Sequence, residues 1–343
     1  MAKAEEHGVA LAQAVPGADP NEVLAGMTLA ARAVLVLRKK GAKVVTLVID
    51  EARADVAEKA RAALAARGGG VELSVAHDAS VADGAKWVER YDVIDGIAVT
   101  DAGGKARAFH ALFEACRKSV DGIVSRHLNR HVSLFISRRI VNLPITPNQV
   151  SVITLALGMA AAWFVAQGGY KQVLLGAFLL QWNSILDGVD GELARVRHQG
   201  SKLGQWVDTL SDDFTNIVFW TSLGFGARGI PTFGPYLFWC GVAAAVSNAV
   251  VALIYYVELI RIGSGDFYDI SWNIPKDVEQ KTLKQKLFVF FAYVLKKDFF
   301  ILFCLALAAV GVLPFALPVL AAGGIGTMVA AGSRGVKRAL AKG

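Results

Sequence analysis

The sequence predicts a multi-pass α-helical membrane protein with a small N-terminal α/β domain on the cytoplasmic side. Of its 343 residues, 54% are hydrophobic, and the mean hydropathy is +0.44, which is too apolar for an ordinary soluble protein. Charged residues are frequent in the first third of the chain, and long apolar runs follow later. The first third alternates β-branched runs with helical patterns, which is typical of a parallel sheet.

The N-terminal domain is expected over residues 1–110. It should contain a helix over 29–38, a strand over 43–49, a helix over 54–66 and a strand over 71–76. Three glycines at 68–70 end the second of these helices. The first thirty residues hold no basic stretch followed by an apolar core, so no cleaved signal peptide is expected.

Residues 111–145 are expected to form a helix that lies in the membrane surface. Apolar residues recur there at helical spacing: Ile123, Leu128, Val132, Phe135, Ile136 and Ile140. Arginines at 126, 130, 138 and 139 supply positive charge beside them, as in interfacial helices. Two roles stay open for these arginines, namely binding an anionic acceptor and anchoring in lipid headgroups.

The remaining residues, 146–343, predict about six membrane spans. They are expected near 150–165, 173–196, 203–225, 236–260, 299–313 and 317–331. Some are shorter or more polar than the roughly 20 apolar residues of a standard span. A second interfacial helix is expected near 283–295, where apolar residues lie opposite lysines.

The basic residues predict the orientation. They precede the first span, separate the second from the third and the fourth from the fifth, and follow the last. By the positive-inside rule, both termini face the cytoplasm in a cell-membrane protein. The net charge of +7 is explained by these flanking residues, so no nucleic-acid partner is expected. The three cysteines are far apart and predict neither disulfides nor a metal site.

Four aspartates form two pairs where apolar segments end. Asp187 and Asp190 are three residues apart, and Asp208 and Asp212 are four apart, so each pair lies on one face of a helix. A charge at membrane depth costs roughly 2.5 to 3.5 kcal/mol on insertion scales, and four of them need a compensating partner. Mg²⁺ or Mn²⁺ would suit these oxygens, with two ions about 3.5 to 4 Å apart. The other interpretation is a pair of solvated helix ends.

The residues around these aspartates resemble the CDP-alcohol phosphotransferase family. Its signature is D-x2-D-G-x2-A-R-x8-G-x3-D-x3-D, a specific pattern of eight fixed positions. The chain fills each of them, with Asp187, Asp190, Gly191, Ala194, Arg195, Gly204, Asp208 and Asp212. The resemblance implies a six-helix, homodimeric membrane enzyme that transfers a phosphoalcohol from a CDP-alcohol to a second alcohol and releases CMP.

The resemblance also implies residue roles. The four aspartates would hold the metal ions, with Asp212 as general base. The residues implied or suited to bind the CDP-alcohol are Asn148, Gly191, Ala194, Arg195 and Gly204. Arg195 suits a phosphate, because its guanidinium forks onto two oxygens. Four basic residues are candidates for acceptor binding, namely Arg138, Arg139, Arg261 and Lys297.

Two further stretches resemble particular branches of this family. Residues 1–110 are similar to the nucleotidyltransferase-like domain fused to archaeal members and to di-myo-inositol-phosphate-phosphate synthases. Because residues 1–30 lack a GxGxR loop, which would hold a triphosphate, we expect a degenerate domain used for docking, dimerisation or substrate channelling. The segments CRKSVDGIVSRHLNR (116–130) and TPNQVS (146–151) resemble the start of the membrane domain in the inositol-phosphate-using branch of the family. Ser151, in place of a frequent threonine, and Asp213, where many relatives carry a basic residue, depart from the pattern.

Two functions remain open at this point. The first is a metal-dependent transferase of substituted phosphate groups, with CDP-diacylglycerol or CDP-inositol as donor and an alcohol or phosphoalcohol as acceptor. Its product would be a phospholipid or a soluble inositol phosphodiester. The second is a non-enzymatic divalent-cation pathway or transporter, which intramembrane acids alone would allow. Arg195 argues against it, because a cation pathway gains nothing from an arginine beside its carboxylates.

Overall fold

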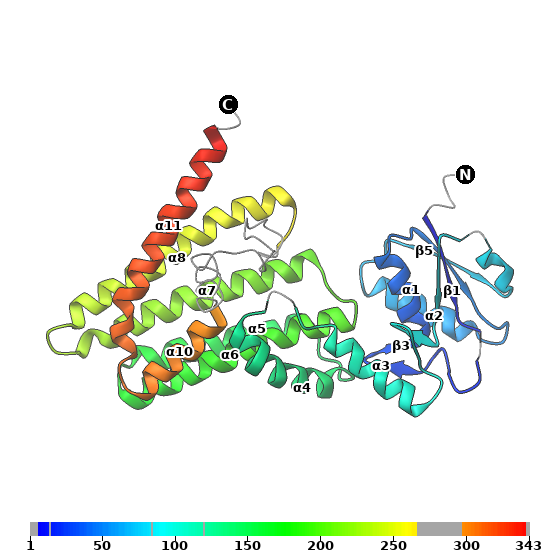
Figure 1. Ribbon diagram of the computed structural model, residues 1–343, viewed down its shortest axis with the longest axis horizontal. Helices are drawn as coiled ribbons and strands as arrows, with labels where there is room; N and C mark the ends of the chain where they lie inside the picture. The colour runs from blue at the N-terminus through cyan, green and yellow to red at the C-terminus, as the bar shows by residue number, and fades with distance from the viewer. Residues whose placement is uncertain (1–5, 14, 84, 119–120, 266–296, 341–343) are drawn as a thin grey trace, which may run out of the picture. The chain divides into compact units, whose positions relative to one another are not determined.

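The structure is a computed structural model that describes residues 6–13, 15–83, 85–118, 121–265 and 297–340 (Figure 1). It divides into two compact units. The N-terminal unit consists of Met1–Lys118, Ser137–Pro144 and Glu192–Gln199. The helical unit consists of Ser119–Ile136, Ile145–Gly191 and Gly200–Gly343. The N-terminal unit therefore includes two short segments that follow it in the sequence.

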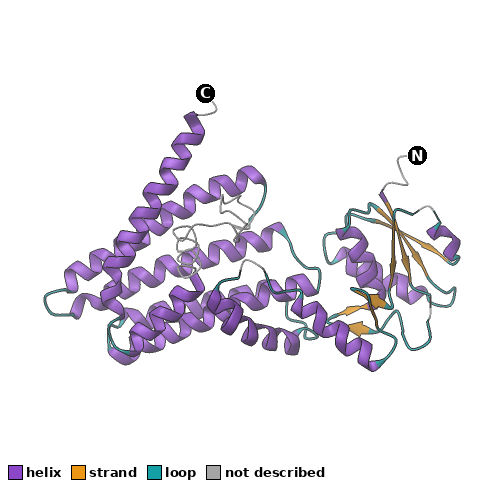
Figure 2. Ribbon diagram, in the orientation of Figure 1, coloured by secondary structure: helices purple, strands orange, loops and turns teal. Residues whose placement is uncertain are grey.

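A parallel sheet forms the centre of the N-terminal unit (Figure 2). Its strands are β1 (His7–Leu11), β4 (Val44–Val48), β5 (Glu72–Ala76) and β6 (Trp87–Arg90), in the order β5-β4-β1-β6. The register places His7 opposite Val44 and Val44 opposite Glu72. The predicted strands at 43–49 and 71–76 are thus confirmed as β4 and β5, and the expected parallel sheet is present.

Helices of this unit bury apolar residues in the same core as the sheet. They are α1 (Leu29–Lys39), α2 (Ala54–Ala65) and α3 (Ala102–Glu114), and the first two match the helices predicted from periodicity. Val34 and Leu37 of α1 are fully buried in the same core as Val45 and Leu47 of β4. Two small hairpins complete the unit, β2 (Val23–Leu24) with β3 (Met27–Thr28), and β7 (Val93–Ile94) with β8 (Ile97–Ala98).

The helical unit contains each of the six helices expected as spans. They are α5 (Pro147–Ala166), α6 (Tyr170–Val196), α7 (Lys202–Gly226), α8 (Gly234–Ile262), α10 (Lys297–Ala309) and α11 (Leu317–Leu340). Among the described residues, three segments are long and apolar enough to cross a membrane, namely Pro147–Ala166, Gly234–Ile262 and Leu313–Ser333. The described part of helix α10 has 13 residues, fewer than the roughly 20 of a span. Helices α6 and α7 carry the aspartates.

The surface helix expected over 111–145 is confirmed in part, because α3 ends at Glu114 and residues 123–140 are helical. A π-helical turn, η3 (Ser125–Asn129), leads into α4 (Arg130–Ile140). Arg130 is buried and forms an ion pair with Asp121, with 2.9 Å between Nε and Oδ2. This arginine is therefore part of the fold and is not presented to lipid or substrate. The second interfacial helix, expected near 283–295, lies outside the described residues.

Small residues allow the helices of this unit to approach closely. A Cβ atom on Gly241 of α8 would lie 2.9 Å from Cα of Gly224 in α7. A Cβ atom on Gly158 of α5 would lie 2.5 Å from Cγ2 of Thr215 in α7. Such contacts between small residues are the usual means of packing helices in a membrane. They place α7, which carries two of the aspartates, against both α5 and α8.

Candidate active site

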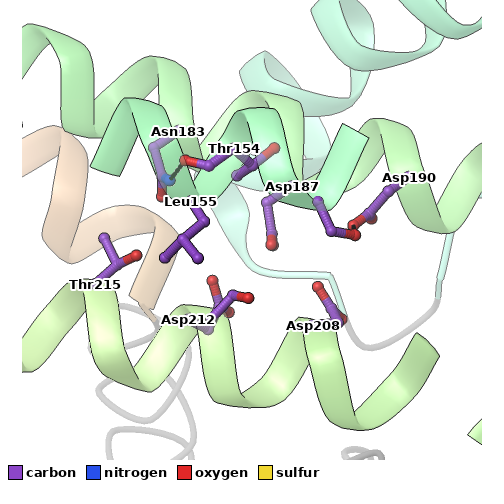
Figure 3. Close-up of a pocket in the computed structure, with 10 residues that line it drawn as sticks. Thr154, Leu155, Asn183, Asp187, Asp190, Asp208, Asp212 and Thr215 are labelled. Carbon is purple, nitrogen blue, oxygen red and sulfur yellow. Dashed lines mark hydrogen bonds between the residues drawn. The ribbon is translucent and has the colours of Figure 1, made fainter. Parts of the chain in front are cut away.

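The four aspartates line one small cavity between α5, α6 and α7. Figure 3 shows Asp187 and Asp190 of α6 facing Asp208 and Asp212 of α7. The cavity has a volume of about 10 Å³ and is also lined by Ser151, Thr154, Leu155, Asn183, Ser211 and Thr215. Helical spacing explains this convergence, because residues three or four apart share a face.

Two carboxylates of this cavity, those of Asp190 and Asp212, have partners that hold them in position. The Ser151 hydroxyl and the backbone N–H of Gly191 both donate to Asp190, which is 5% exposed. Asp187 of α6 and Asp208 of α7 line the same cavity. The Lys297 ammonium of α10 contacts the carboxylate of Asp212. Four acids this close repel one another, so the site favours a cation between them.

The chemistry of these side chains suits a divalent metal ion. Four carboxylates facing one cavity are the hard oxygen donors that Mg²⁺ and Mn²⁺ prefer. Within the described part of the chain, no three His, Cys, Asp or Glu side chains already stand as a compact metal-binding cluster. The four carboxylates are therefore suitable ligands for a divalent metal ion by their chemistry. One of them, that of Asp212, is in contact with the Lys297 ammonium.

The residues predicted to bind the nucleotide are on the helices that form this cavity, α5, α6 and α7, but they do not line it. Gly191 directly follows Asp190 on α6. Asn148 Oδ1 lies 3.6 Å from the position that a Cβ atom would take on Gly204, so these two residues are neighbours. Gly204 is in the first turn of α7, where its N–H donates to the Ser201 hydroxyl at 3.0 Å. Arg195 and Ala194 belong to the last turns of α6.

Arg195 lies near the end of α6, in the segment that belongs to the N-terminal unit. Its Nη2 donates to the carbonyl oxygen of Cys116 at 3.5 Å. It also lines a second, larger cavity, which lies within the N-terminal unit.

Four residues were candidates for acceptor binding, and one of them, Lys297, contacts an aspartate of the cavity, Asp212. Arg138 forms an ion pair with Glu114 at 2.9 Å. Arg261 is exposed at the end of α8, 3.9 Å from Glu258. Arg139 is exposed on α4.

Several polar residues of the site were not singled out from the sequence. Asn183 lies one turn before Asp187 and donates to the carbonyl oxygen of Thr154 at 2.7 Å. Ser211 and Thr215 flank Asp212 on α7 and line the same cavity. Helical spacing from the aspartates, at 183, 187 and 190 and at 208, 211 and 215, would have indicated them.

Asp213 also has a defined partner. The Tyr256 hydroxyl of α8 donates to its carboxylate at 2.6 Å. The acid that departs from the family pattern is thus paired across helices and does not line the aspartate cavity.

Curated proteins with similar sequences have two kinds of name. A "Bifunctional IPC transferase and DIPP synthase" of Aquifex aeolicus is 42% identical over 118 residues, 34% of this chain and 26% of that protein. A Thermococcus kodakarensis protein of the same name is 34% identical over 172 residues, 49% of this chain and 37% of the relative. A "CDP-diacylglycerol--serine O-phosphatidyltransferase" of Mycobacterium leprae is 34% identical over 76 residues, 22% of this chain and 24% of that enzyme.

The similarity thus spans about a quarter to just over a third of each relative's length. A family model gives the broader match. The model described as CDP-alcohol phosphatidyltransferase matches residues 144–319, slightly more than half of the 343 residues. These residues include all four aspartates and the helices that hold them. The chain belongs to the CDP-alcohol phosphatidyltransferase family.

Proposed function

We propose that this protein transfers a phosphoalcohol group from a CDP-alcohol to an acceptor alcohol and releases CMP. The observation that supports this most is the meeting of Asp187, Asp190, Asp208 and Asp212 in one cavity, in a chain of this family. The alternative of a cation pathway explains the acids, but it leaves Gly191, Ala194 and Arg195 of the motif without a role.

In the proposed reaction, the acceptor hydroxyl attacks the phosphorus that carries the donor's alcohol. A new phosphorus–oxygen bond forms there, and the bond from this phosphorus to the bridging oxygen of the pyrophosphate breaks. CMP leaves with that oxygen, and the hydroxyl proton passes to Asp212 as general base. The adjacent Lys297 ammonium orients this carboxylate and offers positive charge to an anionic acceptor.

The remaining roles follow from the chemistry of each side chain. Asp187, Asp190, Asp208 and Asp212 would hold two Mg²⁺ or Mn²⁺ ions, which supply charge neutralisation for the pyrophosphate. Gly191, Ala194 and Gly204 leave room for the nucleotide, and Asn148 lies beside Gly204 to bind it. Arg195 contacts a donor phosphate in this proposal. Arg138, Arg139 and Arg261 are proposed with Lys297 as acceptor contacts.

The relatives' names support two classes of substrate. One name contains CDP-diacylglycerol and serine, and the other contains IPC transferase and DIPP synthase. We propose CDP-diacylglycerol or CDP-inositol as donor, with inositol-type chemistry favoured by the residues around 116–151. The protein is proposed to act as a homodimer in the cell membrane, with six spans and with the active site and both termini on the cytoplasmic side, where the basic residues gather.

The test is CMP release by the full-length protein in detergent. CDP-diacylglycerol, CDP-inositol and CDP-glycerol would be crossed with inositol, inositol phosphate, glycerol phosphate and serine, with Mg²⁺, with Mn²⁺ and with a chelator. We expect release that needs one donor and one acceptor together and that stops when the metal is chelated. Release that continues at full rate in the chelator would remove the metal from the proposal. Failure of the folded protein to bind any CDP-alcohol would contradict the whole assignment.

A further inference from the structure

A large cavity in the N-terminal unit is lined by residues that, apart from Arg195, have no role in the proposed transfer reaction. Its volume is about 540 Å³, which is within the range of pockets that hold small ligands. Helix α1 forms one side, the end of β6 and the β7 hairpin form another, and the end of α6 with His198 closes it. All of these residues belong to the N-terminal unit, which includes 192–199. The four aspartates are not among them.

The wall of this cavity carries an excess of positive charge. Its basic residues are Arg32, Lys39, Lys40, Arg90 and Arg195, against two acids, Glu89 and Asp95. Lys40 is paired with Glu89, and Arg90 is paired with Asp92 at 2.7 Å. Among the residues that the structure describes, Arg32, Lys39 and Arg195 form no ion pair with a carboxylate. Because Arg195 is already proposed to contact the donor phosphate, Arg32 and Lys39 are the cations that remain for a second anion.

Arg32 is the most informative of these cations because it is 3% exposed. Its Nη atoms donate to the carbonyl oxygens of Val196 at 2.9 Å and of Leu24 at 3.0 Å. Its Nε has no hydrogen-bond partner within the described structure. Neutral carbonyl groups do not neutralise a guanidinium, and the Asp95 carboxylate of the same cavity offsets only part of the cost of burying this charge. Burial accordingly lowers the pKa of Arg32 to about 10.

His198, which also lines the cavity, is close to several of the same positive charges. It follows α6 in the left-handed region, with φ of 50°, a conformation that costs energy in a residue other than glycine. Burial lowers the pKa of its imidazole to about 4, and nearby Arg32, Lys39, Arg67 and Arg38 add to this effect. The imidazole is therefore neutral at pH 7 and can donate a hydrogen bond without adding to the charge.

Apolar side chains cover the rest of the wall. Leu29 and Val36 of α1 and Ile94 of β7 line the cavity beside the cations. A cavity of this size and composition would accommodate an anionic group together with an organic part. We propose that it binds a small phosphate monoester, whose phosphate contacts Arg32 and Lys39 and whose organic part lies on the apolar side chains. This site goes beyond the transfer reaction proposed above.

Phosphate is favoured over a carboxylate by charge and geometry. A phosphate monoester carries nearly two negative charges at pH 7 and three acceptor oxygens, which matches a buried guanidinium and a lysine better than a single carboxylate does. A planar guanidinium also binds phosphate in a forked geometry. The organic part has two chemical sources, a nucleoside and a small polyol, and the test below distinguishes them.

The test is isothermal titration of the full-length protein in detergent with CMP, glycerol 3-phosphate, inorganic phosphate and uncharged glycerol. The chelator EDTA and the Asp208→Asn variant remove the aspartate site, so binding there does not interfere. We expect saturable binding of at least one monoester, tighter than that of inorganic phosphate, and no binding of glycerol. Whether CMP or glycerol 3-phosphate binds more tightly identifies the nucleoside or the polyol as the organic part.

Variants assign the binding to this cavity. Lys39 is exposed, so Lys39→Glu should fold, and it should weaken binding about tenfold or more by replacing attraction with repulsion. Lys59→Glu is the matched control, an exposed lysine of α2 that does not line the cavity, and it should change binding less than twofold. Arg32→Gln should abolish binding where circular dichroism shows it folded.

Four results would overturn the proposal. One is the absence of saturable binding of both monoesters to the wild-type protein. Another is equal binding by wild type and Lys39→Glu, and the third is inorganic phosphate binding as tightly as either monoester. Loss of binding in Asp208→Asn with EDTA would place the ligand at the aspartates and would also overturn it. None of these outcomes depends on CMP release, so this proposal and the transfer reaction fail separately.

Discussion

At the scale of single residues, the pairing of Asp212 with Lys297 gives the clearest prediction. Asp212→Asn keeps the size of the side chain but removes the proton acceptor. We expect this variant to bind the CDP-alcohol, while transfer falls by about 10²- to 10⁴-fold, the usual contribution of a general base. Binding would be measured by titration, and transfer by CMP release.

Asp213→Asn is the matched control for this change. Asp213 is the next residue on the same helix, but its carboxylate accepts a hydrogen bond from Tyr256 and does not line the aspartate cavity. We expect this variant to keep its turnover within a few fold. Full turnover in Asp212→Asn would remove that residue from the role of base.

His198 makes the stability of the protein depend on pH. Its pKa is lowered from 6.5 to about 4 by burial, with Arg32, Lys39, Arg67 and Arg38 as the charged groups around it. Between these two pH values the unfolded chain binds a proton that the folded chain does not, so stability falls as the pH drops through this range. Between pH 7.5 and pH 5, this histidine should reduce the free energy of unfolding by up to about 2 kcal/mol.

The His198→Asn variant tests this dependence. Asparagine tolerates the left-handed conformation and does not titrate, so the acid sensitivity of the melting temperature should be smaller than in wild type. His131→Asn, at an exposed position on α4, is the control and should behave as wild type does. Identical pH profiles for His198→Asn and wild type would contradict the assignment.

Some residues of the site can be predicted from the sequence, whereas the contacts of others cannot. The spacing of Asp187, Asp190, Asp208 and Asp212 predicted their convergence, because helical periodicity is a local property. The contact between Lys297 and Asp212 has no local signal, because it joins helices that are far apart in the sequence. Arg195 shows the same limit, since its motif indicates a phosphate role, whereas its contacts depend on which unit the end of α6 joins.

At the scale of elements, close helix packing depends on particular glycines. A Cβ atom on Gly241 would lie 2.8 Å from the carbonyl oxygen of Trp220, which is too close without a shift of α7 or α8. Gly241→Ala should therefore destabilise the protein by about 1 to 3 kcal/mol, although alanine favours a helix more than glycine does. The measurement is the thermal unfolding midpoint in detergent.

Gly326→Ala is the matched control, because Gly326 of α11 is also within a helix. A Cβ atom on Gly326 would meet no other atom within 4 Å among the described residues. Alanine there should leave the midpoint unchanged or raise it slightly, by helix propensity alone. Equal midpoints for the two variants would show that the contact between α7 and α8 does not limit stability.

Element prediction was most successful where a pattern is long and regular. The helices of both units follow from periodicity. Thr146 and Gln149 form a capping box, with Pro147 as the first helical residue, and this starts α5 close to its expected beginning. Strand β1 and strand β6 were not predicted. Their small or exposed residues, such as Gly8 and Arg90, give little apolar alternation, and the pairing of β1 with β4 and with β6 is a tertiary property.

At the scale of the whole molecule, the chain passes more than once between its two units, and the composition does not indicate this. Residues 192–199 belong to the N-terminal unit although they end a helix of the other one. Long-range hydrogen bonds hold them there, including Arg67 Nε to the carbonyl oxygen of Arg197 at 2.7 Å and Arg197 Nε to that of Val141 at 2.9 Å. Such hydrogen bonds join segments that are distant in the sequence. The sequence therefore predicted two domains, but it did not predict that residues 192–199 belong to the first of them.

The most direct test of the central claim is to follow the fate of the two donor phosphates. The donor would carry an isotopic label in the phosphate next to its alcohol, and the products would be separated after reaction with the acceptor. Phosphoalcohol transfer predicts that all the label enters the acceptor product and that CMP is unlabelled, with no product in Asp208→Asn. Label on a free phosphoalcohol would show hydrolysis instead, and a CMP-linked acceptor would show attack at the other phosphorus, and either result would contradict the account.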